Sequence, residues 1–287
     1  MTSSSFEIDN LVYLREDKEK TGFYASDVHR PAWELWNSWM GIAKTNPTPW
    51  YDYLKMEAGS GVEKAMLKVL KDSKIVQEDY DQNVHGKINY TRDGVEIHGR
   101  MDAVTLDGFP IEIKSINNKN NWDISAYEDG YPRENYVGQL AIYMDALGVD
   151  TGYLFVASVD GLHRFWFKCT REGTNQRFTC GKTVFDLDKE ILRWKDLYDN
   201  YVVTKTEPDV FEYVYKKPIE EIDWTKVSAD KISKARNNRA VIGDYQVAWS
   251  GWKDLWINKQ GSVPGYTASE LVKIKELTDG YSTWKKK

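Results

Sequence analysis

The sequence of 287 residues contains only two cysteines, Cys169 and Cys180. Two thiols cannot build a disulfide framework or a four-thiolate metal site by themselves. The chain has no run of about 18 apolar residues, so no membrane-spanning helix is expected. Residues 1–10 are Ser-rich and acidic and lack the apolar stretch of a secretory signal. We therefore expect a cytoplasmic protein without a membrane partner, encoded by a cell or by a phage.

Net positive charge is also lacking. The chain has 39 Lys and Arg against 44 Asp and Glu, which gives a formal net charge of −5. This balance argues against a broad nucleic-acid-binding surface, which is usually basic, but it leaves room for a local basic groove. Aromatic residues make up 14% of the chain, with 12 Trp. They can fill a hydrophobic core or stack on bases, and the core is the simpler interpretation.

Hydrophobic periodicity predicts an α/β protein with helical flanks. We predict a single domain over residues 1–287, in which a core at about 55–200 is covered by helical segments at 1–54 and 201–287. The predicted segments are helices at 25–43, 50–71, 136–147, 186–201, 229–239 and 268–277, strands within 74–116, a second hairpin at 151–159 and 162–169, and a loop at 117–135.

The most informative stretch contains Asp102, Glu112 and Lys114. Residues i and i+2 of a strand point to the same face, so Glu112 and Lys114 face one site. Ile111 and Ile113 then face the opposite, apolar side. Two carboxylates that share one divalent cation, with a lysine nearby, are the parts of a site for phosphodiester hydrolysis.

The turn at residues 107–109 determines which residues of this hairpin oppose one another. A two-residue turn would place Asp102 on the wrong face, whereas a three-residue loop with a bulge glycine pairs Val104 with Glu112 and Asp102 with Lys114. Because Pro110 also disfavours a regular two-residue ladder, we predict the three-residue loop.

The chemistry expected of these groups follows from the cation. Mg²⁺ and Mn²⁺ prefer oxygen ligands, which Asp102, Glu112 and the carbonyl group of Ile113 supply. Lys114 would hold a water and offset charge in the transition state. The alternative interpretation is a solvated strand with an ion pair.

Two further segments carry polar residues in the same order along the chain. Glu63 follows the small-residue stretch at 59–61, and Gln139 and Tyr143 lie at i and i+4 on one helix face. Alternatively, Glu63 is a solvated carboxylate, and Gln139 is a surface amide beside the half-buried ring of Tyr143. Arg100 is a candidate phosphate-binding residue or a partner in an ion pair. The basic residues Lys119 and Arg133 could follow a DNA backbone or be solvated loop charges.

The series G-x-x-x-E, G-R-M-D, E-I-K and Q-x-x-x-Y, which spans residues 59–143, resembles the PD-(D/E)XK nucleases of the RecB/AddB exonuclease type. The resemblance implies a restriction-endonuclease-like core, with a mixed central β-sheet flanked by helices. It also implies that Glu63, Asp102 and Glu112 bind the metal, that Lys114 is the catalytic lysine, and that Gln139 and Tyr143 touch DNA or order the site. The family usually has His at the first position, whereas this chain has Glu63, as in lambda-exonuclease-like relatives.

Many relatives of this type carry an iron–sulfur cluster, for which this chain lacks the cysteines. The corresponding positions are His29, Val247, Ser250 and Trp256, none of which is a thiolate. We therefore expect no iron–sulfur cluster. Our hypothesis is that Trp249, Trp252 and Trp256 pack against the stripe Trp33, Trp36 and Trp39 and replace the cluster.

The expected activity is that of a Mg²⁺- or Mn²⁺-dependent deoxyribonuclease, an exonuclease of DNA recombination, repair or phage DNA processing. Expected partners are single- or double-stranded DNA ends and a recombination or replication protein. The alternatives are an endonuclease or nickase of the same fold, a non-catalytic DNA-binding subunit, and an aromatic-rich protein-interaction module with a coincidental motif.

Overall fold

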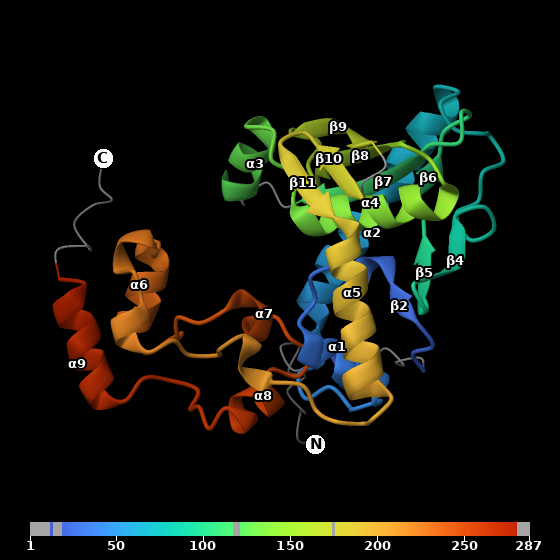
Figure 1. Cartoon of the computed structure of the whole chain (residues 1–287). Coiled ribbons are helices and arrows are strands. Elements are labelled where there is room, and N and C mark those ends of the chain that lie inside the picture. Colours follow the sequence, from blue (N-terminus) through green and yellow to red (C-terminus); the bar gives the residue numbers. More distant parts are fainter. Residues whose placement is uncertain (1–11, 14–18, 117–120, 174–175, 280–287) are drawn as a thin grey trace, which may run out of the picture. The chain divides into compact units, whose positions relative to one another are not determined.

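The computed structural model describes residues 12–13, 19–116, 121–173 and 176–279 (Figure 1). The chain forms two compact units, which we describe separately. The first comprises residues 1–29 and 48–206, and the second comprises residues 30–47 and 207–287. The prediction that the flanking segments pack on one nuclease core stays a prediction.

The first unit alternates strands and helices. Its elements are β1 (Val12–Tyr13), β2 (Phe23–Tyr24), a 3₁₀-helix (Ala25–Asp27), β3 (Thr48–Pro49), α2 (Trp50–Asp72), β4 (Lys87–Arg92), β5 (Val95–Arg100), β6 (Ala103–Val104), β7 (Pro110–Ile116), α3 (Asn121–Glu128), α4 (Glu134–Leu147), β8 (Thr151–Ser158), β9 (Arg164–Arg171), β10 (Arg177–Cys180), β11 (Thr183–Asp186), α5 (Leu187–Leu197) and a π-helical turn (Tyr198–Val202).

The strands form a six-stranded sheet in the order β11-β10-β9-β8-β7-β6, a three-stranded sheet β2-β5-β4 and the pair β1-β3. In the six-stranded sheet β7 and β8 are parallel and the other neighbours are antiparallel. The chain passes from β7 to β8 through α3 and α4, because parallel neighbours need a crossover connection. The predicted α/β class with a mixed sheet flanked by helices is confirmed, and this order of elements fits the expected restriction-endonuclease-like core.

Alternation along β7 separates a core face from a polar face. Ile111 and Ile113 are fully buried in a cluster with Leu70 of α2. Glu112 and Lys114 point to the other face, as predicted, since successive side chains alternate across a strand. Close approach of α2 to β7 is permitted by Gly59, where an added Cβ would lie 2.5 Å from the Ser115 hydroxyl oxygen.

The predicted helices of this unit are present at α2, α4 and α5. α4 ends at Gly148, which adopts the left-handed conformation with φ of 66°. The Asp186 side chain caps α5 by accepting a hydrogen bond from the Lys189 backbone N–H at 3.2 Å. These local signals were sufficient to place the helix ends.

Two segment predictions were wrong, and two strands were missed. The helix predicted at residues 25–43 is interrupted, because Pro31 disfavours helical geometry in the residue before it, and α1 (Ala32–Trp39) begins only after Pro31. The predicted loop at 117–135 contains the helix α3. The strands β10 and β11 were not predicted.

The register predicted for the β6–β7 hairpin was also wrong. Val104 pairs with Pro110, not Glu112, and the connection has five residues. A three-residue loop with a positive-φ glycine is present, but at 106–108 and not at 107–109, because the Thr105 N–H donates to the Phe109 carbonyl at 2.8 Å. Thr105 also forms a bridge with Val76, and the Leu106 N–H donates to the Ile75 carbonyl at 2.9 Å. The shift is two residues, so each side chain keeps its face of the sheet.

The second unit is helical, as predicted for its C-terminal part. It contains α1, α6 (Ala229–Arg236), α7 (Tyr245–Ala248), α8 (Lys253–Lys259), α9 (Ala268–Leu277) and three 3₁₀-helices (Val210–Glu212, Ile219–Glu221 and Trp224–Lys226).

One hydrophobic core among the described residues of the second unit is aromatic. Trp33 and Trp256 are fully buried with ring centroids 4.9 Å apart, and Val247 and Trp252 belong to the same cluster. Trp249 is instead 78% exposed, so this member of the expected aromatic set lies outside the core. In both units, no helix of the described residues has the length and apolar character needed to cross a membrane.

Candidate active site

The polar face of β7 presents Glu112 and Lys114 to one site. Glu112 is 1% exposed, and its carboxylate forms an ion pair with the Lys114 ammonium. Apart from that ion pair, neither carboxylate oxygen has a hydrogen-bond partner in the described part of the chain. A buried carboxylate in this state is costly, because its lost hydration is not replaced by donors.

Asp102 lies between β5 and β6 and is fixed against β7. Its Oδ2 accepts the Ile113 backbone N–H at 2.8 Å. The N–H and C=O of one strand residue point to the same edge, so the Ile113 carbonyl faces the side on which Asp102 lies. The structure therefore brings together Asp102, Glu112, Lys114 and the Ile113 backbone.

Burial controls the electrostatics of the site. It raises the pKa of Glu112 to about 8, with Asp102 and Glu63 adding to the increase and Lys114 opposing it. Burial also raises the pKa of Asp102, although Lys114 and the Ile113 N–H lower it. For Lys114, burial lowers the pKa, but the carboxylates of Glu112 and Asp102 outweigh this effect and raise it above its ordinary value. Burial in this site therefore disfavours the ionised forms of Glu112 and Asp102.

Glu63 of α2 lies near this cluster. Burial raises its pKa, and Asp102 raises it further, while Lys114 and Arg100 lower it. Within the described residues, however, no three acidic, histidine or cysteine side chains are close enough together to hold one metal ion. The role of Glu63 as a third metal ligand stays a prediction.

The residues present still fit a hard divalent cation. Mg²⁺ is usually bound by one or two carboxylates and keeps several waters, so a three-carboxylate cage is not required. The orphaned buried oxygens of Glu112, with Asp102 and the Ile113 carbonyl beside them, provide such a donor set.

Tyr143 and Gln139 lie on the α4 face that covers the site. The Tyr143 hydroxyl donates to the Arg100 carbonyl at 3.0 Å and accepts from Gln139 Nε2 at 2.8 Å. Tyr143 is buried, and an added Cβ at Gly99 would lie 2.7 Å from its ring. These contacts hold the end of β5, which leads to Asp102. They support an ordering role for the pair, while contact with DNA stays a prediction.

Arg100 is exposed at the edge of the site. Its guanidinium donates to Asn83 Oδ1 at 3.0 Å, and its charge lowers the pKa values of Asp102 and Glu63. Arg100 is thus close enough to act on the carboxylates electrostatically and remains accessible to a phosphate group.

Sequence reasoning missed Tyr136, whose ring lies under the Lys114 ammonium at 5.6 Å from the ring centroid. The Arg133 guanidinium contacts the same ring, also at 5.6 Å. The signal was available, because Tyr136, Gln139 and Tyr143 share one helix face at i, i+3 and i+7. The other basic candidate, Lys119, lies outside the described residues.

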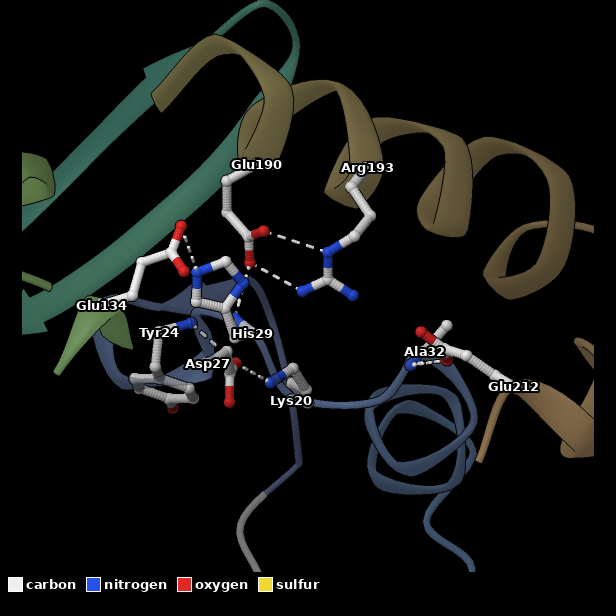
Figure 2. A network of polar contacts seen from close by, with 9 residues as sticks. All are labelled: Lys20, Tyr24, Asp27, His29, Ala32, Glu134, Glu190, Arg193 and Glu212. Atoms are coloured by element: carbon white, nitrogen blue, oxygen red, sulfur yellow. Dashed lines mark hydrogen bonds and ion pairs between the residues drawn. The ribbon is translucent and has the colours of Figure 1, made fainter. Parts of the chain in front are cut away.

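A separate cavity of about 590 Å³ lies beside the first residues of α4 and α5. The His29 backbone N–H donates to Glu190 at 3.0 Å, and the Arg193 guanidinium donates to both oxygens of Glu190 (Figure 2). The His29 ring lies 3.5 Å from Glu134. The acidic groups of this wall are already paired, so no ligand chemistry follows from the arrangement.

Comparison with known proteins gives distant similarities only. No protein-family model matches the sequence, and no curated protein is significantly similar to it. Among solved structures, the protein SSO0001 is similar with 16% identity and a TM-score of 0.41 over 68% of this chain and 82% of its own.

Two structures of LHK-Exo are also similar. LHK-Exo in complex with dAMP has 18% identity and a TM-score of 0.41 over 65% of this chain and 88% of its own. The alkaline exonuclease LHK-Exo from Laribacter hongkongensis has 15% identity and a TM-score of 0.37 over the same shares of the two chains. Likenesses this low carry no functional weight, so function must be argued from the site.

Proposed function

We propose that the protein is a Mg²⁺- or Mn²⁺-dependent deoxyribonuclease that acts on DNA ends as an exonuclease. The observation that carries the proposal is the buried carboxylate of Glu112, whose oxygens have only the Lys114 ammonium as a partner. Such a buried ion pair does not explain itself by a gain in stability, since replacing a buried ion pair by apolar residues is often neutral or stabilising. A divalent cation held with Asp102 would compensate the charge.

In this proposal Asp102, Glu112 and the Ile113 carbonyl hold the metal. A bound Mg²⁺ or Mn²⁺ supplies a Lewis acid for the phosphoryl group and lowers the pKa of a bound water. Lys114 stays protonated and orients the attacking water or the phosphate oxygen.

Residues around this group have supporting roles in the proposal. Tyr143 and Gln139 keep the end of β5 in place, and Arg100 binds a phosphate group from the exposed side. Glu63 contributes negative charge from α2, as a ligand of the metal or through a water.

The exonuclease assignment rests on the resemblance of residues 59–143 to the RecB/AddB type, as do a role in DNA recombination, repair or phage DNA processing and a recombination or replication protein as partner. An endonuclease or nickase of the same fold and a non-catalytic DNA-binding subunit predict other results in the experiment below.

The test is degradation of linear, nicked and covalently closed circular DNA with Mg²⁺, Mn²⁺ or EDTA. We expect metal-dependent loss of the linear substrate, no cleavage of closed circles, and no activity in EDTA. Lys114→Ala should abolish cleavage and leave folding intact. The matched control Lys195→Ala, which removes an exposed cation from the same unit, should cleave at the native rate.

Each alternative gives a distinct result. Cleavage or nicking of closed circles identifies an endonuclease. DNA binding without cleavage under any metal identifies a non-catalytic subunit. Native rates for both Lys114→Ala and Asp102→Ala place the active site elsewhere and refute the assignment.

A further inference from the structure

The six-stranded sheet has a second face, opposite the candidate active site. Strand pairing aligns Ile113 with Phe155 and Phe155 with Trp166, and it aligns Glu112 with Leu154 and Leu154 with Phe167. Directly opposed residues share a face of the sheet. Trp166 therefore lies on the face of Ile113, whereas Glu112 lies on the face of Phe167.

Helix α2 packs on this second face over β7, where Ile111 and Ile113 are buried. On β9 the same face is open, because Arg164, Trp166 and Lys168 are all exposed. Trp166 is 45% exposed. β9 lies on the β11 side of β8 in the sheet (Figure 1).

Trp166 is held in a fixed orientation. Its ring stacks on Tyr153 with centroids 5.4 Å apart and an interplanar angle of 27°, and it packs on Phe155 at 5.6 Å. An exposed indole with its rotamer fixed by neighbouring rings presents a flat apolar surface at a low entropy cost.

A cation flanks this indole on each side along β9. Arg164 and Lys168 lie two residues before and after Trp166, a spacing of about 7 Å. Neither side chain has an ion pair or hydrogen bond within the described part of the chain. The rows that carry the three residues contain no acid, since their other members are Ser115, Ala157, Ile113, Phe155, Ala103, Ile111 and Tyr153. In a chain of net charge −5, this is a local basic surface.

We propose that this surface, which we call the β9 face (Arg164, Trp166 and Lys168), binds single-stranded DNA. Arg164 and Lys168 bind phosphate groups, and a base stacks on Trp166. A base in a duplex is already stacked between its neighbours, so the exposed indole favours a single strand. If the proposed nuclease function holds, removal of one strand of a duplex leaves the complementary strand as the ligand of this face.

The experiment measures binding of a fluorescein-labelled oligothymidylate to the full-length protein in EDTA, where no cleavage is expected. Trp166→Ala should weaken binding about tenfold, the typical loss for one stacked base. The double variant Arg164→Gln/Lys168→Gln should reduce the slope of log K against log salt by about 1.4, or about 0.7 for each phosphate contact.

Matched controls come from elsewhere in the chain. Trp249→Ala removes a more exposed indole, and Lys195→Gln removes an exposed lysine, so both should bind as the native protein does. Trp166→Phe keeps an aromatic ring against Tyr153 and should lose less affinity than Trp166→Ala. The Phe variant thus separates loss of stacking from loss of folding.

Photocrosslinking with a 5-iodouracil strand provides a readout that a purely structural Trp166 would not give. An adduct on Trp166 supports the proposal, and adducts confined to other residues overturn it. Native affinity and salt dependence in Trp166→Ala and Arg164→Gln/Lys168→Gln overturn it as well. Binding of a polyglutamate probe with the same dependence on Trp166 would assign the face to an acidic protein instead.

Failure of the binding proposal can be distinguished from failure of the proposed nuclease function. If the native protein cuts no DNA but binds single strands through Trp166, the nuclease function fails and the β9 face stands. If cleavage depends on Lys114 while the β9 variants bind normally, the nuclease function stands and the β9 face fails.

Discussion

The buried carboxylate of Glu112 has the Lys114 ammonium as its ion-pair partner, and neither of its oxygens has a hydrogen-bond partner in the described part of the chain. Burial favours the protonated form of the carboxyl group, and a divalent cation favours the ionised form. Proton and metal should therefore compete for the same residue.

The first prediction concerns the pH dependence of stability without metal. The folded pKa of Glu112 is about 8, above its ordinary value of 4.5, so the folded state binds the proton more tightly. The stability that this proton contributes is complete below about pH 4.5 and is lost as the pH rises through about 8. Glu112→Gln lacks this titration. In EDTA the variant should gain stability relative to the native protein between pH 5 and pH 8, as measured by urea denaturation. A pH-independent difference would contradict the assigned environment.

The second prediction concerns Tyr143. Tyr143→Phe keeps the buried ring but removes the hydroxyl group that joins Gln139 to the Arg100 carbonyl. We expect a loss of about 1–3 kcal/mol in the free energy of unfolding, because buried polar partners are left unpaired. Turnover should also fall, since the end of β5 positions Asp102. Tyr198→Phe, at a more exposed tyrosine, serves as the control. Native stability and turnover in Tyr143→Phe would remove the ordering role.

At the residue scale the sequence predicted the groups but not their surroundings. The alternation of Ile111, Glu112, Ile113 and Lys114 is local, so the shared face of Glu112 and Lys114 could be predicted. The full burial of Glu112 and the ring of Tyr136 under Lys114 depend on how α4 packs on β7. Neither feature is encoded in the strand's own residues.

At the scale of elements, the contact between α2 and β7 sets the position of Glu63 relative to the carboxylates of the site. Gly59 permits this contact, whereas Gly61 on the same helix has nothing within 4 Å of an added Cβ. The two glycines thus have different reasons to be present, although both lie in one helix.

The third prediction uses this difference. Gly61→Ala should stabilise the protein by up to about 1 kcal/mol, because alanine is the better helix former. Gly59→Ala should be less stable than Gly61→Ala by about 1 kcal/mol or more, since its Cβ meets the Ser115 hydroxyl at 2.5 Å. Adding Ser115→Ala should restore most of the difference. Thermal melts of the four proteins test this, and equal effects at both glycines would contradict the close approach.

The register of the hairpin between β6 and β7 could not be predicted from the residues of these two strands and their turn. Turn chemistry predicted a three-residue loop with a bulge glycine, which is present but displaced by one position, and Thr105 and Leu106 also bond to residues 75–76, which lie far away in the sequence. Such a tertiary competitor cannot be predicted from the turn residues. The side chains of the hairpin still lie on the predicted faces of the sheet, because the register differs from the predicted one by two residues.

At the scale of the whole molecule, the helical second unit has its own cores, and one of them contains Trp33 and Trp256 in contact. Periodicity predicted its helices at α6 and α9. It did not predict a division into two compact units, because residues 30–47 join a unit whose other members begin at residue 207. That association is a long-range property of the chain.

The fourth prediction concerns this aromatic core. Trp256→Ala should cost about 3–5 kcal/mol in the free energy of unfolding, because a fully buried indole is removed together with its hydrogen bond to the Val210 carbonyl at 2.7 Å. Trp249→Ala, at an exposed site, should change stability by less than about 0.5 kcal/mol. Freshly purified native protein should also contain no iron. A four-iron absorbance spectrum would contradict the hypothesis that aromatic packing replaces a cluster.

The central claim is that Asp102 and Glu112 hold a divalent cation, and isothermal titration calorimetry of Mn²⁺ binding to the protein tests it most directly. The native protein should bind Mn²⁺ with release of protons near neutral pH, because Glu112 must ionise. Glu112→Gln should lose this binding, and Glu96→Gln, at an exposed acid of β5, should retain it. Equal Mn²⁺ binding by the native protein and Glu112→Gln would show that the metal site, and with it the active site, lies elsewhere.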